Sequence, residues 1–128
     1  MRLLLDTHLL LWAFNEPEKL PARAREFMED EDNLLLFGIS TIWEVTIKTA
    51  RNKPDFRINP IRFRDKLIEN QFIELPITSN HAIAVAALPP IHKDPFDRIL
   101  IAQATCEGIF LLTSDTLLAQ YPGPILLV

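Results

Sequence analysis

The sequence has one cysteine, one tyrosine and three glycines among 128 residues, and it contains no long apolar run. The lone Cys106 cannot form an internal disulfide, which fits a reducing compartment, and we expect its thiol to be buried as a small apolar side chain. Every apolar run is much shorter than the roughly 20 residues that a membrane-spanning helix needs. The run that starts at Leu3 breaks at Asp6, too early for a signal peptide. We therefore expect a cytoplasmic protein that has no contact with a membrane.

Two further absences narrow the chemistry and the topology. The histidines His8, His81 and His92 are scattered and there is one cysteine, so no cluster has the spacing of a zinc site. His8 and His92 remain candidates for proton transfer. The chain also has no hairpin dipeptide such as Asn-Gly, which argues against an antiparallel sheet.

The charge is unevenly distributed along the chain. The formal net charge is −4, which argues weakly against a nucleic-acid partner. Between Lys48 and Lys66, however, there are seven basic and two acidic residues. This segment is either a phosphate-facing patch on an acidic body or a solvated loop and helix surface.

Short apolar runs alternate with helical patterns throughout the chain. We expect one domain covering residues 1–128, because its 48% apolar composition is enough to bury a core. The alternation favours a parallel α/β sheet of four to five strands covered on both faces. The expected strands are residues 2–5, 34–37, 72–77, 109–112 and 125–128, with 72–77 as an edge. The expected helices are residues 7–14, 21–30, 42–48, 60–70, 79–88, 95–107 and, briefly, 116–120.

Four acidic residues fall where this topology brings distant segments together. Asp6 and Asp115 follow strands, Glu44 lies in the first turn of the helix after the second strand, and Asp97 opens the helix before the fourth. All four positions lie at the carboxyl edge of the sheet, where ligands bind in open α/β folds. Clustered carboxylates repel one another unless a cation lies between them. A hard divalent ion, Mg²⁺ or Mn²⁺, would suit these oxygen ligands and support hydrolysis of a phosphodiester.

The same acids can also be explained as helix caps. Thr41 and Glu44 have the spacing of a capping box, and Asp6 and Asp115 can each cap a short helix. Asp94, followed by Pro95, can cap the helix at 95–107, which leaves Asp97 available for another role. Spacing alone leaves both interpretations open.

Four motifs in order along the chain resemble the PIN-domain family, and within it the VapC-type toxins of prokaryotic toxin–antitoxin modules. The resemblance covers essentially the whole chain. The motifs are Leu4-Leu5-Asp6-Thr7-His8, Ser40-x-x-Trp43-Glu44 with Ile47-Lys48, Asp94-Pro95-Phe96-Asp97-Arg98 with Ala102-Gln103-Ala104, and Thr113-Ser114-Asp115.

This resemblance implies a three-layer α/β/α fold and an endoribonuclease that depends on Mg²⁺ or Mn²⁺. It places the catalytic metal ligands on Asp6, Glu44, Asp97 and Asp115. It also implies a homodimer and a cognate antitoxin that blocks the cleft.

Other residues would lie beside the ligands or on the path of the RNA. The small hydroxyl residue near the metals would be Thr113 or Ser114, with Thr7 as a further candidate. Asp94 would cap the helix or bind an outer water, and Arg98 would contact phosphate or pair with a carboxylate. The candidates for contact with RNA phosphates are Lys48, Arg51 and Lys53.

Two other functions stay open at this point. One is a catalytically degenerate domain of the same fold that only binds a partner, although all four acids are retained. The other is an aspartyl-phosphate phosphatase or receiver-like domain with Asp6 as nucleophile, although His8 stands where the phosphatase pattern expects a second acid. The RNA target, the number of metal ions and the identity of the antitoxin are not given by the sequence.

Overall fold

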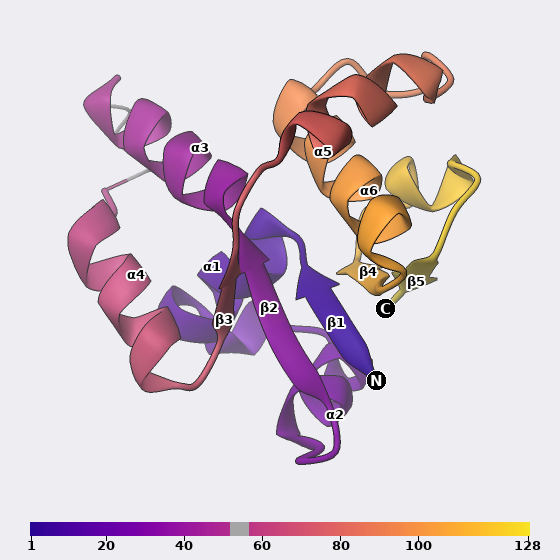
Figure 1. The fold of residues 1–128 in the computed structure, drawn as a ribbon. Helices are drawn as coiled ribbons and strands as arrows, with labels where there is room; N and C mark the ends of the chain where they lie inside the picture. The colour runs from indigo at the N-terminus through magenta and orange to yellow at the C-terminus, as the bar shows by residue number, and fades with distance from the viewer. Residues whose placement is uncertain (52–56) are drawn as a thin grey trace.

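A parallel sheet of five strands forms the centre of the computed structural model, which describes residues 1–51 and 57–128 (Figure 1). The strands are β1 (Arg2–Leu5), β2 (Leu34–Gly38), β3 (Ile73–Leu75), β4 (Phe110–Thr113) and β5 (Ile125–Leu127). Their order is β3-β2-β1-β4-β5, and every neighbouring pair is parallel. The chain therefore builds outward from β1 in one direction and then returns to add β4 and β5 on the other side. The switch point lies between β1 and β4, and the predicted parallel α/β fold is confirmed.

Helices cover both faces of this sheet. They are α1 (Thr7–Asn15), α2 (Ala22–Glu29), α3 (Ile39–Ala50), α4 (Pro60–Glu69), α5 (Ser79–Ala84) and α6 (Pro95–Glu107), with 3₁₀ turns η1 (Pro17–Lys19), η2 (Val85–Ala87) and η3 (Leu118–Gln120). Because alternate strand residues point to opposite faces, Leu3 and Leu5 join a core with α1, α2, α3 and α4. Leu4 points the other way and packs in a second core with α6 and η3.

The helix after β2 begins earlier than its sequence predicts. It starts at Ile39, directly after Gly38, so Glu44 lies in its second turn. The predicted capping box is wrong: no side chain caps this helix, and the hydroxyl of Thr41 instead lies 3.0 Å from that of Thr7. Gly38 lies close to α6: a Cβ at this position would come within 2.9 Å of Leu100 Cδ2, so any larger residue would force one of the two segments to shift.

Smaller differences occur in the second half of the chain. The helix predicted over 79–88 is α-helical only to Ala84 and continues as η2, and its cap is Thr78 rather than Ser79. The predicted strand at 72–77 is shorter, Ile73–Leu75, but lies at the sheet edge as expected. Cys106 is exposed, contrary to the prediction, because it lies on the outer surface of α6. Within the described ranges, no helix is both long and apolar enough to cross a membrane.

Candidate metal centre

Asp6 lies at the carboxyl end of the central strand, where β1 passes into α1. Its Oδ1 accepts a hydrogen bond from the backbone N–H of Leu9 at 2.9 Å and so caps α1, as one interpretation of the sequence predicted. Its Oδ2 accepts a short hydrogen bond from the hydroxyl of Thr113. Burial raises the pKa of Asp6, with these two hydrogen bonds opposing the effect. With both oxygens engaged and 2% of its surface exposed, Asp6 is poorly placed for attack as an aspartyl-phosphate nucleophile.

Thr113 connects the neighbouring strand ends. β4 pairs with β1, which brings Thr113 beside Asp6 at the same edge of the sheet. The Thr113 hydroxyl oxygen also accepts a hydrogen bond from the backbone N–H of Asp115 at 3.0 Å. Of the two predicted hydroxyl residues, Thr113 is thus the one that contacts a carboxylate, and Ser114 lies half-buried beside it.

Asp97 projects from the first turn of α6 into the cluster. Asp94 caps this helix by accepting from the N–H of Phe96 at 2.8 Å, so the prediction that Asp94 and Pro95 start the helix is confirmed. Asp97 is itself not needed as the cap. Burial, together with the charges of the surrounding acids Asp94, Glu44, Asp6 and Asp115, raises the pKa of Asp97 to about 8. Because the charges of acids from other segments raise the pKa of Asp97, these acids must lie near it.

Glu44 is the most buried of the four predicted acids. Only 1% of its surface is exposed, and its Oε2 lies 2.5 Å from the ammonium of Lys48, one helical turn later on α3. Its Oε1 is buried and has no hydrogen-bond partner among the described residues. A buried carboxylate oxygen left without a partner is costly unless a ligand satisfies it.

His92 also faces the cluster, although no sequence motif assigned it there. Its Nε2 lies 3.3 Å from Oδ2 of Asp97 and 3.7 Å from Oδ2 of Asp115. One donor atom from each of these three residues lies within 4.8 Å of the others. The sequence had marked His92 as a candidate for proton transfer, two residues before the cap of α6, but not as a neighbour of Asp97 and Asp115.

Arg98 makes no ion pair with a carboxylate of the described residues. Its guanidinium donates to the backbone carbonyls of Val85, Leu88 and Pro89 and to the hydroxyl of Tyr121, at 2.9 to 3.4 Å. The predicted pairing of Arg98 with a carboxylate is therefore wrong. The planar guanidinium instead ties η2 and the following loop to α6.

Of the remaining predicted residues, Thr7 and Arg51 lie within the part of the chain that the structure describes. Thr7 is buried against Thr41 and makes its hydroxyl contact there rather than to an acid. Arg51 is exposed at the end of α3. Lys53, the third residue predicted to contact RNA, lies outside the described residues.

The donor set fits a hard divalent cation. It consists of carboxylate oxygens from four segments, two of them deeply buried, and one buried oxygen lacks a partner. Oxygen-only sets of this kind suit Mg²⁺ and Mn²⁺, which keep bound waters and leave positions open for phosphate oxygens. The arrangement can therefore accommodate a hard divalent cation.

Comparisons with known proteins support this architecture. Residues 3–124 match the model of the PIN domain family. Ribonuclease VapC22 from Mycobacterium tuberculosis is 30% identical over 122 residues, which cover 94% of this chain and 92% of that protein.

Two solved structures have the same fold at low sequence identity. The first is VapBC2 from Rickettsia felis bound to a DNA fragment from its promoter, with a TM-score of 0.75 at 12% identity, covering 100% of this chain and 99% of the other. The second is DNA-bound VapBC from Salmonella typhimurium, with a TM-score of 0.66 at 17% identity, covering 98% and 97%. The family match and the curated relative each span nearly the whole chain, and the chain therefore belongs to the PIN domain family.

Proposed function

We propose that this chain is a VapC-type toxin: an endoribonuclease, dependent on Mg²⁺ or Mn²⁺, that hydrolyses RNA phosphodiester bonds as a single domain over residues 1–128. The observation that carries the proposal is the convergence of Asp6, Glu44, Asp97 and Asp115 at one edge of the sheet. The similarity to Ribonuclease VapC22 supports RNA as the substrate.

These four carboxylates are the residues that we assign as metal ligands and catalytic groups. A bound cation would polarise a phosphate oxygen, lower the pKa of a coordinated water and offset charge on the leaving oxygen. Thr113 holds the carboxylate of Asp6 and the backbone of Asp115 together, so the Asp6 carboxylate is oriented in advance. Lys48 binds one oxygen of Glu44, and the other has no hydrogen-bond partner among the described residues.

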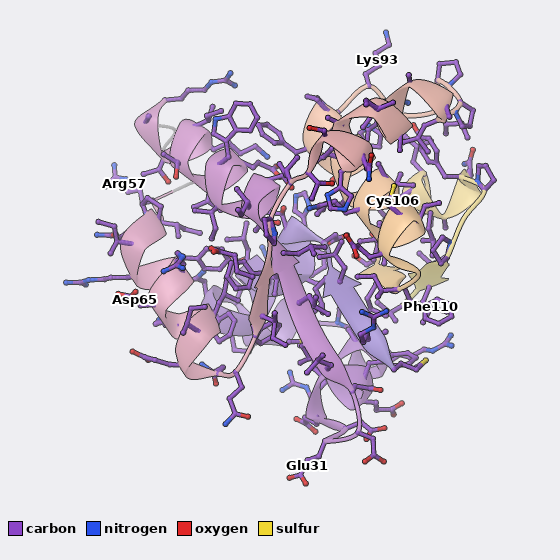
Figure 2. The ribbon with its side chains drawn as sticks, in the orientation of Figure 1. Glu31, Arg57, Asp65, Lys93, Cys106 and Phe110 are labelled. Carbon is purple, nitrogen blue, oxygen red and sulfur yellow. The ribbon has the colours of Figure 1, made fainter. Side chains whose placement is uncertain are left out.

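A hollow beside the centre provides a surface for the RNA strand. It has a volume of about 390 Å³, and its lining includes His8, Trp12, Lys48 and Arg57. His8 lines this hollow and lies on α1 two residues after Asp6. Figure 2 shows Arg57 in the stretch that leads to α4. Cationic and aromatic side chains together are the usual lining for single-stranded nucleic acid. We assign Lys48 and Arg51 to phosphate contacts on this side.

The proposed partners are an antitoxin and a second copy of the chain. The structural neighbours are VapBC toxin–antitoxin complexes, which supports an antitoxin that acts with this protein in the cytoplasm, where its RNA substrate is found. Large apolar side chains are exposed on two helices, with Trp43 at 59% and Ile83 at 72%. Trp43 packs edge-on against Phe96, with ring centroids 5.4 Å apart, so it presents a firm apolar surface. Light scattering on the purified chain tests the homodimer.

The direct test of the activity is cleavage of a mixed RNA pool by the wild type and by Asp6→Asn. Wild type should cleave with Mg²⁺ or Mn²⁺ and stop with excess EDTA, and Asp6→Asn should lose at least about a hundredfold in rate. Equal cleavage by both proteins would refute the assignment of the centre. Cleavage by neither, with both proteins folded and binding Mn²⁺, would instead favour a degenerate binding module.

A further inference from the structure

The backbone of His92 is hydrogen-bonded to a buried side chain of the core. Its backbone N–H donates to the hydroxyl oxygen of Tyr121 at 2.7 Å, and that hydroxyl donates back to the carbonyl of His92 at 3.2 Å. Arg98 donates to the same Tyr121 oxygen at 3.1 Å. Tyr121 is 4% exposed and belongs to the core on the α6 face. The loop that carries His92 is therefore fixed to the core through one phenol group.

The ring of His92 is fixed as well. Its Nδ1 accepts a hydrogen bond from the backbone N–H of Asp94 at 3.0 Å. This bond requires a lone pair on Nδ1, so the proton of the neutral ring is on Nε2. The nitrogen that carries this proton, Nε2, lies 3.3 Å from Oδ2 of Asp97 and 3.7 Å from Oδ2 of Asp115, close enough for an electrostatic contact with each carboxylate.

The distances alone would allow Nε2 of His92 to be either a metal ligand or an N–H donor, and the tautomer distinguishes between these two roles. The donor atoms of His92, Asp97 and Asp115 lie close enough to surround one ion, and an imidazole nitrogen would bind a transition metal well. A metal bond to Nε2 needs a lone pair there, which would move the proton to Nδ1 and set it against the N–H of Asp94. The hydrogen bond from Asp94 thus favours an N–H donor at Nε2 and disfavours a ligand.

We propose that His92 is a positioning residue of the carboxylate centre: its fixed Nε2–H holds Asp97 and Asp115 in place, and His92 does not bind the metal itself. The inference rests on the proposed function, because it takes these two acids to be metal ligands. An N–H dipole beside the Oδ2 atoms of Asp97 and Asp115 lowers the repulsion between the two acids. The lone pairs that face away from His92 are then available to the cation. Asp97 comes from α6 and Asp115 from the end of β4, so His92 links two separate segments.

The experiment measures metal binding without RNA, by calorimetric titration of Mg²⁺ and Mn²⁺ at pH 7.5. The variants are His92→Leu, which removes the donor, and His92→Gln, which places an amide N–H near the same position. Lys93→Ala is the matched control, because Lys93 is exposed on the same loop and points away from the molecule (Figure 2). Asp97→Asn serves as the reference for loss of a ligand. Circular dichroism checks that each variant is folded.

His92→Leu should lower the affinity for Mg²⁺ and for Mn²⁺ by the same factor, about tenfold, and His92→Gln should recover most of this loss. Nitrogen-15 NMR of the wild type should show the Nε2–H tautomer of His92 both before and after Mg²⁺ is added. A selective loss of Mn²⁺ binding, or transfer of the proton to Nδ1 on metal addition, would make His92 a ligand and overturn the proposal. Unchanged binding in His92→Leu would overturn it too, provided that Asp97→Asn still loses the ion. If Asp97→Asn also binds normally, the metal centre itself is wrong, and the proposed function fails with it.

Discussion

Replacing Asp97 with Asn should make the metal-free protein more stable while it weakens metal binding. Burial and the neighbouring acids raise the pKa of Asp97 in the folded protein from 3.8 to about 8. At pH 7 the unfolded chain therefore carries an ionised Asp97, whereas the folded protein must keep the carboxyl protonated. Asn never ionises, so this cost of folding disappears. One pKa unit corresponds to about 1.4 kcal/mol, so Asp97→Asn should raise the free energy of unfolding at pH 7 by about 2 to 4 kcal/mol.

The pH dependence gives the sign of this effect. Between pH 3.8 and about 8 the folded state binds more protons at Asp97 than the unfolded state, so the stability of the metal-free wild type falls as pH rises through this window. The difference between wild type and Asp97→Asn should therefore be small near pH 4 and should grow toward pH 8. Saturating Mn²⁺ should reverse the order, because the ion stabilises the ionised centre of the wild type.

The assay is urea unfolding in EDTA at pH 4, 5.5, 7 and 8, repeated at pH 7 with Mn²⁺. Asp65→Asn is the control, because Asp65 is exposed on α4, away from the centre (Figure 2), and its change should stay within about 0.5 kcal/mol of the wild type. An Asp97→Asn protein that is no more stable than the wild type at pH 7, or a difference that does not change with pH, would refute the argument that the acids repel one another.

Two other substitutions test the groups around the acids. Thr113→Val removes the hydroxyl that Asp6 and the backbone of Asp115 share, so it should cost about 1 to 3 kcal/mol in urea unfolding and weaken Mn²⁺ binding in calorimetry; unchanged binding would mean that Thr113 does not orient these groups. Arg98→Lys loses the planar set of donors to the η2 segment and to Tyr121, so it should cost about 1 to 3 kcal/mol of stability with little change in the affinity for RNA. Weaker RNA binding at full stability would assign Arg98 to phosphate contact after all.

The sheet and the positions of Asp6 and Asp115 at its edge could be predicted because both depend on short-range pattern and topology. Apolar runs such as Leu3 to Leu5 are too short for helices and too apolar for surface strands, so they indicate buried parallel strands. Once the sheet is parallel, a residue that directly follows a strand must lie at its carboxyl edge. Asp6 and Asp115 were therefore brought to one place by topology alone.

The predictions that were wrong or missing concern contacts between segments that are distant in the sequence. Thr41 and Glu44 have capping-box spacing, but Gly38 lets the helix start earlier against α6, and that close approach cannot be read from local sequence. Arg98 follows a charged motif, yet its donors meet carbonyls from η2 that only the fold brings near. The backbone of His92 is held by the hydroxyl of Tyr121, which is 29 residues away. Propensity and periodicity carry no information about such pairs.

Calorimetric titration of Mn²⁺ into the metal-free protein is the measurement that tests the central claim most directly. If the carboxylates form one cation site, the wild type binds Mn²⁺ with release of protons, because Asp97 must ionise. Asp6→Asn, Glu44→Gln, Asp97→Asn and Asp115→Asn should each weaken binding by at least about tenfold, and Asp65→Asn should not. Equal Mn²⁺ affinity in all five variants and the wild type, with every protein folded, would contradict a shared centre.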